Sequence, residues 1–77
     1  MGSAIVDFTV HLDEELAPEE QCKLEDFVRD QDGVVSAGIS IKHPHLMMVA
    51  YAVDQNKPSN ILHQIQKRGL HAELIGL

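Results

Sequence analysis

The centre of the chain decides its fold. Residues 33–53 read GVVSAGISIKHPHLMMVAYAV, with a proline-containing turn at residues 42–45. Before the turn, residues 34–42 show the alternation typical of a half-buried strand. The alternating apolar positions are Val35, Ala37, Ile39 and Ile41. After the turn, residues 46–53 form an apolar run that indicates a strand central in its sheet. Two strands joined by a short turn predict a hairpin.

A strand and a helix are predicted before the hairpin. Residues 4–12 alternate, with one face formed by Val6, Phe8, Val10 and Leu12. Pro18 suits the first turn of a helix, where its missing N–H needs no partner. The following acids, Glu19 and Glu20, favour the positive end of the helix dipole. An apolar stripe at helical spacing consists of Leu24, Phe27 and Val28. The Asp32-Gly33 turn ends this helix.

A second helix and a last strand are predicted after the hairpin. The helix begins in residues 56–59, which contain a proline, and Gly69 ends it. Its core stripe consists of Ile61, Leu62 and Ile65. Residues 71–77 form the last strand, with Ala72 and Leu74 on one face.

The order strand, helix, strand, strand, helix, strand predicts an α+β fold of the ferredoxin-like βαββαβ type. Two right-handed crossovers joined by a hairpin give a four-stranded antiparallel sheet with both helices on one face. A chain of 77 residues has the size of one domain, so residues 1–77 are taken as a single unit.

The uneven charge distribution indicates which kinds of partner the protein could bind. The net charge is −6, and residues 1–33 hold ten acids against Lys23 and Arg29, which is −8. An acidic first half with few aromatic residues argues against nucleic-acid binding. A basic partner protein or a cation fits better. No apolar run approaches the roughly 18 residues of a membrane span, so we expect no membrane insertion. The single cysteine, Cys22, allows no internal disulfide, and we expect a cytoplasmic protein.

Three stretches resemble the heavy-metal-associated domain family. They are Gly33-Val34-Val35-Ser36, then Val49-Ala50-Tyr51-Ala52-Val53-Asp54, then Ile61 to Ala72. The pattern covers about two-thirds of the chain and consists mostly of core and turn positions. The resemblance implies metal binding, metal transport or a metallochaperone-like role. In the family, a Cys-x-x-Cys at the first helix binds soft ions such as Cu(I). The matching positions here are Ala17 and Glu20. Cu(I) binding by a thiolate pair is therefore not expected, and Cys22 lies on the polar helix face.

Histidines offer a different set of ligands. The predicted topology brings His11, His43, His45 and His71 to one end of the domain, where the family holds its metal. Imidazoles, with a carboxylate from the first loop, suit Zn(II), Ni(II), Cu(II) or Co(II) rather than Cu(I). The alternative is that these are ordinary exposed side chains, because His-x-His in a turn has no diagnostic metal spacing. His63 is expected to face solvent on the second helix.

Three functions follow from these features, and none is enzymatic, since no nucleophile–base set or phosphate loop is present. The first is a domain that binds a divalent transition metal through the loop histidines. The second is a metal-free interaction module, which docks a partner protein or a second copy through its acidic first helix or its open sheet face. We expect that face to hold one of Met47 and Met48, with Ala50, Ala52, Ile75 and Leu77. The third is an ACT-type regulatory domain, disfavoured because the first loop lacks an Asp-x-x-Gly-like turn.

Overall fold

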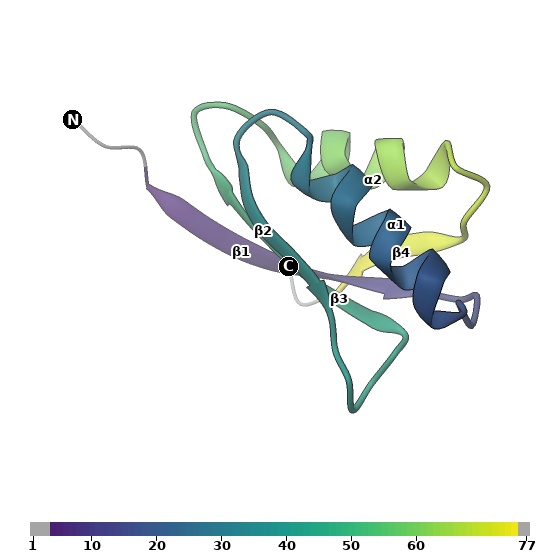
Figure 1. Ribbon diagram of the computed structural model, residues 1–77. Coiled ribbons are helices and arrows are strands. Elements are labelled where there is room, and N and C mark those ends of the chain that lie inside the picture. The colour runs from purple at the N-terminus through teal and green to yellow at the C-terminus, as the bar shows by residue number, and fades with distance from the viewer. Residues whose placement is uncertain (1–3, 76–77) are drawn as a thin grey trace.

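The computed structural model describes residues 4–75 and has the predicted βαββαβ order. The elements are β1 (Ile5–Leu12), α1 (Pro18–Arg29), β2 (Val34–Ile39), β3 (Leu46–Ala52), α2 (Pro58–Gln66) and β4 (Ala72–Ile75). The strands form one antiparallel sheet in the order β2-β3-β1-β4. Both helices cover the same face of this sheet (Figure 1). The predicted fold class is confirmed.

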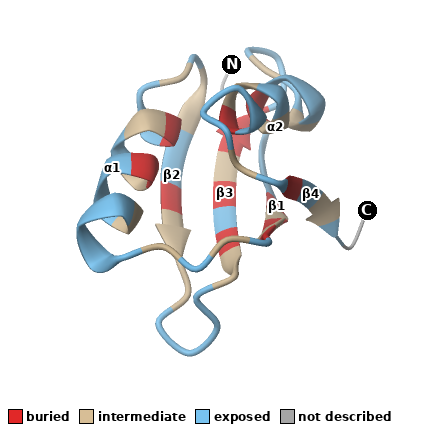
Figure 2. Cartoon of the chain, turned by 90° about the vertical axis from the view of Figure 1, so that its right-hand side faces the viewer, coloured by how far each residue is buried: buried red, intermediate tan, exposed pale blue. Residues whose placement is uncertain are grey.

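The core lies between the sheet and the two helices. Its fully buried side chains are Val10, Leu12, Leu24, Val28, Met47, Val49, Ile61 and Ile65. Buried positions recur along one side of the strands and along the inner sides of α1 and α2 (Figure 2). The alternation predicted for β1 supplies Phe8, Val10 and Leu12 to the core, but the prediction was wrong for Val6, which is 40% exposed. The stripes predicted for both helices also supply the core, with Phe27 and Leu62 partly buried at its margin.

Local sequence explains where both helices begin and how the chain turns after α1. Pro18 and Pro58 each stand at the first position of a helix. The backbone N–H of Ala17 donates to Glu20 Oε1 at 3.1 Å, which satisfies one donor at the start of α1. After α1, Gly33 adopts a φ of 76°, a conformation that glycine adopts without steric cost.

The prediction for the second strand was wrong in two places. A β-bulge lies between Val34 and Ser36, so the alternation shifts by one residue. Val34 consequently packs against the core, whereas Val35 is 58% exposed. The strand also ends at Ile39, and Ile41 stands in the hairpin loop with 97% of its surface exposed.

The sheet face without helices, called the open face below, also differs from the prediction in detail. Met48 is exposed on the open face, as predicted for one of the two methionines, and Met47 is buried in the core. The prediction was wrong for Ala52, which is buried at the end of β3, where its N–H donates to the carbonyl of Gly33 at 2.8 Å. Leu77 lies outside the described residues.

Three loops meet at one end of the sheet, as the topology predicted. The N–H of Leu12, at the end of β1, donates to the carbonyl of His45 in the hairpin at 2.7 Å. The N–H of Asp13 donates to the carbonyl of His71, before β4, at 2.9 Å. We call this the loop end of the domain. Neither helix of the described chain has the length and apolar character needed to cross a membrane.

Candidate metal centre

The loop end contains one cluster of side chains that could hold a metal ion. His11 lies near the end of β1, opposite Glu73 on β4, and Asp13 follows one residue after the strand. One ligand atom from each of these three residues lies within 4.8 Å of the other two. No other group of three or more histidine, cysteine or acidic residues meets this distance within the part of the chain that the structure describes.

The inner nitrogen of His11 is the unusual atom of the cluster. Its Nδ1 is buried from solvent and makes no hydrogen bond. Asp13 Oδ1 lies 3.2 Å away, so the two atoms form a close polar contact without the direction a hydrogen bond requires. A buried polar atom without a partner costs free energy, and an ion bound between the two atoms would remove that cost.

His45 lies beside His11 and has a defined tautomer. The two rings stack, with centroids 5.9 Å apart and an interplanar angle of 16°. His45 Nδ1 lies 2.7 Å from the carbonyl oxygen of Leu12. Because a carbonyl oxygen only accepts, the neutral ring must carry its proton on Nδ1. The electron pair of Nε2 is then free, which is the arrangement by which a backbone carbonyl orients a metal-binding histidine.

His71 forms its hydrogen bonds with Glu14. The Glu14 carboxylate accepts a hydrogen bond from His71 Nδ1 at 2.6 Å and from the His71 backbone N–H at 2.8 Å. The hydrogen bond between the side chains raises the pKa of His71 and lowers the pKa of Glu14. Because Glu14 occupies Nδ1, a metal ion could bind His71 only through Nε2, after this nitrogen has lost its proton.

His43 lies in the exposed part of the hairpin. Its backbone N–H donates to Ser40 Oγ at 3.1 Å, and its carbonyl accepts from the N–H of Leu46. The structure thus brings His11 and His45 together, leaves His71 with Glu14, and holds His43 at the turn. His63 is exposed on α2, as predicted.

Sequence reasoning missed Glu73 as a member of this cluster. Glu73 alternates with the core positions Ala72 and Leu74 on β4, so its placement on the open face could have been inferred. Its position opposite His11 depends on the β1–β4 register, which no local pattern encodes.

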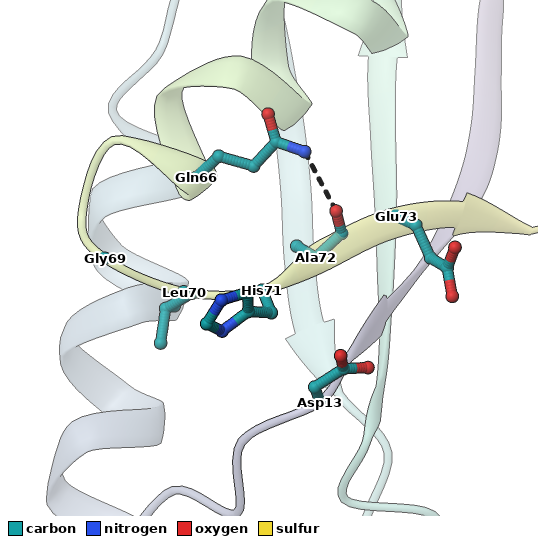
Figure 3. Close-up of a pocket in the computed structure, with 7 residues that line it drawn as sticks. All are labelled: Asp13, Gln66, Gly69, Leu70, His71, Ala72 and Glu73. Carbon is teal, nitrogen blue, oxygen red and sulfur yellow. Dashed lines mark hydrogen bonds between the residues drawn. The ribbon is translucent and has the colours of Figure 1, made fainter.

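A shallow hollow of about 470 Å³ lies beside the two carboxylates of the cluster. Its lining includes Asp13, Gln66, His71 and Glu73. In Figure 3 the carboxylates of Asp13 and Glu73 lie on the same side of β4, and the His71 ring lies beside the loop that leads into this strand. An ion from solvent could therefore reach both carboxylates.

The positions that match the family's thiolate pair carry no metal-binding thiol. Ala17 and Glu20 stand at the start of α1, where the Glu20 carboxylate accepts from the Ala17 N–H. Cys22 is exposed on the helix. The candidate metal centre is thus on the sheet and its flanking loop instead of on the first turn of α1.

No family model and no curated protein sequence matches the chain. Several solved structures do match the chain. The N-terminal domain of a potential copper-translocating P-type ATPase from Bacillus subtilis, in its Cu(I)-loaded state, superposes with a TM-score of 0.83 at 15% identity, over 95% of this chain and 90% of that chain. Oxidized MerP from Ralstonia metallidurans CH34 gives 0.82 at 8% identity, over 95% of this chain and 100% of its own. A copper-binding domain of the P-type ATPase HMA7 gives 0.81 at 17% identity, over 91% and 93%.

The chain has the fold of the heavy-metal-associated domains. The resemblance seen in the sequence is therefore confirmed for the fold. At identities below 20%, the likeness to these three structures carries no information about which ligand atoms this chain uses. Those atoms must be argued from its own side chains.

Proposed function

We propose that this heavy-metal-associated-like domain binds a divalent transition metal ion at the loop end and serves in metal transport or homeostasis. The observation that carries the proposal is the convergence of His11, Asp13 and Glu73 within 4.8 Å. The ion is cargo in this proposal, and no catalytic step is involved. The copper-binding and copper-translocating descriptions of two of these structural neighbours support the same class of role.

The donor atoms favour particular ions. One imidazole and two carboxylates suit Zn(II), Ni(II), Co(II) or Cu(II), whereas Cu(I) prefers thiolate and thioether sulfur. With His11 neutral, the cluster carries a charge of −2 from its two carboxylates, which a divalent ion would neutralise. His45, whose ring stacks on His11, is the candidate for a fourth ligand. Its nitrogens lie outside the group within 4.8 Å, so its Nε2 would have to move toward the ion. His43 and His71 remain predicted ligands that would have to move to reach the ion.

Titration of the purified protein with Zn(II), Ni(II), Co(II) and Cu(II) tests the proposal, with calorimetry for affinity and histidine NMR resonances for location. We expect one ion per chain and the largest shifts at His11 and His45. His11→Ala should weaken binding by at least about tenfold, since loss of even an outer-shell partner costs roughly 10–100-fold. His63→Ala, on exposed α2, is the matched control. Equal affinity of the His11→Ala protein and the wild type would exclude this site.

The alternative is a metal-free interaction module of the same fold. The observation that favours it is the exposure of Met48 (50%) and Ile75 (38%) on the open face. Under this alternative, the four metal titrations would give only weak and scattered shifts. We further propose a cytoplasmic location, since the chain's single cysteine is free.

A further inference from the structure

The pairing between β1 and β4 ends beside the candidate metal centre, and Glu14 completes it. Leu12 pairs with Ala72, and one step further the N–H of Asp13 donates to the carbonyl of His71 at 2.9 Å. In a regular antiparallel ladder, two residues that face each other in this way exchange both of their hydrogen bonds. Here the N–H of His71 donates instead to the Glu14 carboxylate, at 2.8 and 3.1 Å. The Glu14 side chain therefore takes the place of a backbone acceptor.

The same carboxylate also holds the ring of His71. Glu14 Oε2 lies 2.6 Å from His71 Nδ1, so the backbone and the ring of one residue both donate to Glu14. The Glu14 side chain is 32% exposed, whereas the side chain of its neighbour Asp13 is 62% exposed. Glu14 is not among the three residues whose ligand atoms converge in the described part of the chain. Its oxygens already have donors, so its place is next to the candidate metal centre and not in it.

Two of the three candidate metal ligands stand on the segments that Glu14 joins. Asp13 directly precedes Glu14, and Glu73 follows His71 by two residues. Both ligand side chains are exposed, so no packing against the core fixes their positions. The distance between the two carboxylates consequently depends on how closely the two backbone segments are held together.

Charge repulsion opposes this arrangement before an ion binds. Asp13 and Glu73 each place an oxygen within 4.8 Å of the other, and two negative charges at this distance repel. The single backbone hydrogen bond from Asp13 to His71 would leave the two segments free to pivot apart. The contacts of Glu14 with the backbone and the ring of His71 resist that movement.

Ligands that are held in place before the ion arrives bind it more tightly. Less conformational freedom is then lost on binding, and the exposed carboxylates need not be brought together at that moment. Residues that orient metal ligands without touching the metal commonly change its affinity by roughly 10–100-fold when they are replaced. Glu14 has the hydrogen bonds and the position in the sequence that such a role requires.

We infer that Glu14 is a positioning residue of the metal centre: through His71 it holds Asp13 and Glu73 within reach of one ion, and it does not coordinate that ion itself. The role depends on the acceptor oxygens of Glu14 and not on its negative charge. This inference rests on the proposed function, because it concerns the affinity of the same centre for its ion.

Calorimetric titration with Zn(II) of the wild type and two Glu14 variants, all at one pH, tests the inference. Glu14→Ala removes all three contacts and should weaken binding by at least about tenfold. Glu14→Gln keeps an amide oxygen that can accept from the His71 N–H, so it should bind within about threefold of the wild type. In the metal-free proteins, hydrogen exchange of the Asp13 amide should be faster in Glu14→Ala and close to wild type in Glu14→Gln.

Asn56→Ala is the matched control. Asn56 also makes three hydrogen bonds, with the carbonyl of Asp32, the N–H of Lys57 and the side chain of Asn60. It joins two loops at the end of the sheet opposite to the loop end, where β2 begins and β3 has ended. Asn56→Ala should therefore bind Zn(II) like the wild type.

The outcomes separate the two proposals. If Glu14→Ala binds Zn(II) as tightly as the wild type, the inference is overturned and the metal centre stands. If Glu14→Gln binds as weakly as Glu14→Ala, the charge or direct coordination is responsible, and the inference is overturned. Equal losses in Asn56→Ala and Glu14→Ala, or a Glu14→Ala protein that does not fold, would make Glu14 a residue of general stability and overturn it as well. If the wild type does not bind Zn(II), the proposed function fails and this inference fails with it.

Discussion

Glu14 and His71, 57 residues apart in sequence, join the loop after β1 to the loop before β4 through three close contacts. The Glu14 carboxylate accepts from the ring Nδ1 of His71 and from its backbone N–H. Glu14 follows Asp13 directly, and His71 precedes Glu73 by two residues. The pair therefore fixes the backbone segments that carry two of the three candidate metal ligands.

The first prediction concerns the pH dependence of this pair. The hydrogen bond raises the pKa of His71 above its usual 6.5 and lowers the pKa of Glu14 below its usual 4.5. His71 therefore contributes its full stabilisation of the folded state below pH 6.5, and this stabilisation is lost as the pH rises through the pKa that His71 has in the folded protein. The contribution of Glu14 is complete above pH 4.5 and is lost as pH falls. We expect the pair to stabilise the fold most between about pH 4.5 and 6.5.

NMR titration of the His71 ring measures this directly, and urea unfolding of wild type and Glu14→Gln at pH 5.5 and pH 8.5 measures its effect on stability. The difference between the two proteins should be larger at pH 5.5. The His71 ring in the Glu14→Gln protein serves as the reference. A His71 that titrates at the same pH in both proteins contradicts the prediction.

A second prediction concerns three glycines in different environments. A Cβ at Gly33 would lie 2.7 Å from Gln55 Cβ, and φ is 76°. At Gly69 φ is 90° but no atom lies within 4 Å, and at Gly38 no close atom and no unusual φ are present. Gly69→Ala should lower the free energy of unfolding by about 1–2 kcal/mol through backbone strain alone. Gly33→Ala should lower the free energy of unfolding by more than Gly69→Ala does, whereas Gly38→Ala should leave it unchanged or raise it slightly. Urea denaturation gives the order, and equal costs at Gly33 and Gly38 would contradict it.

The contrast between local and non-local information explains what the sequence could predict. Alternation in β1 and the stripe of Leu24 and Val28 are local patterns, and both describe the observed core. The bulge beside Val35 could not be read, because two consecutive valines fit either register of a strand. The proximity of His11 and His45 could be predicted from the topology alone. The place of Glu73 opposite His11 depends on the register between β1 and β4, and the Glu14–His71 hydrogen bonds depend on side-chain positions in the assembled sheet, so neither could be predicted.

A third prediction tests the core that holds both helices on the sheet. Leu24 on α1 and Ile65 on α2 have at most 1% of their surface exposed. Replacing either with alanine removes buried methyl groups and leaves a cavity, so each change should lower the free energy of unfolding by about 2–5 kcal/mol. Ile41→Ala, at a residue that is 97% exposed, should change it by less than about 0.5 kcal/mol. Urea unfolding of the three variants makes the comparison. Similar values for Ile65→Ala and Ile41→Ala would show that the helix is not packed as described.

A fourth prediction restores the thiolate pair that the family resemblance places at Ala17 and Glu20. The two residues stand three apart at the exposed start of α1, so cysteines there would lie on adjacent positions of the first turn. The Ala17→Cys/Glu20→Cys protein should bind Cu(I), measured by competition with a colorimetric Cu(I) chelator under reducing conditions, because two thiolates suit this soft ion. It should lose about 1 kcal/mol of stability with the Glu20 hydrogen bond.

The wild type, which keeps only Cys22, is the control and should not compete for Cu(I). The variant should retain wild-type Zn(II) affinity, since His11, Asp13 and Glu73 are unchanged and form a separate centre. A variant that gains Cu(I) but loses Zn(II) binding would mean that the two centres overlap. A variant that gains no Cu(I) affinity would mean that the first turn of α1 cannot direct two thiolates toward one ion.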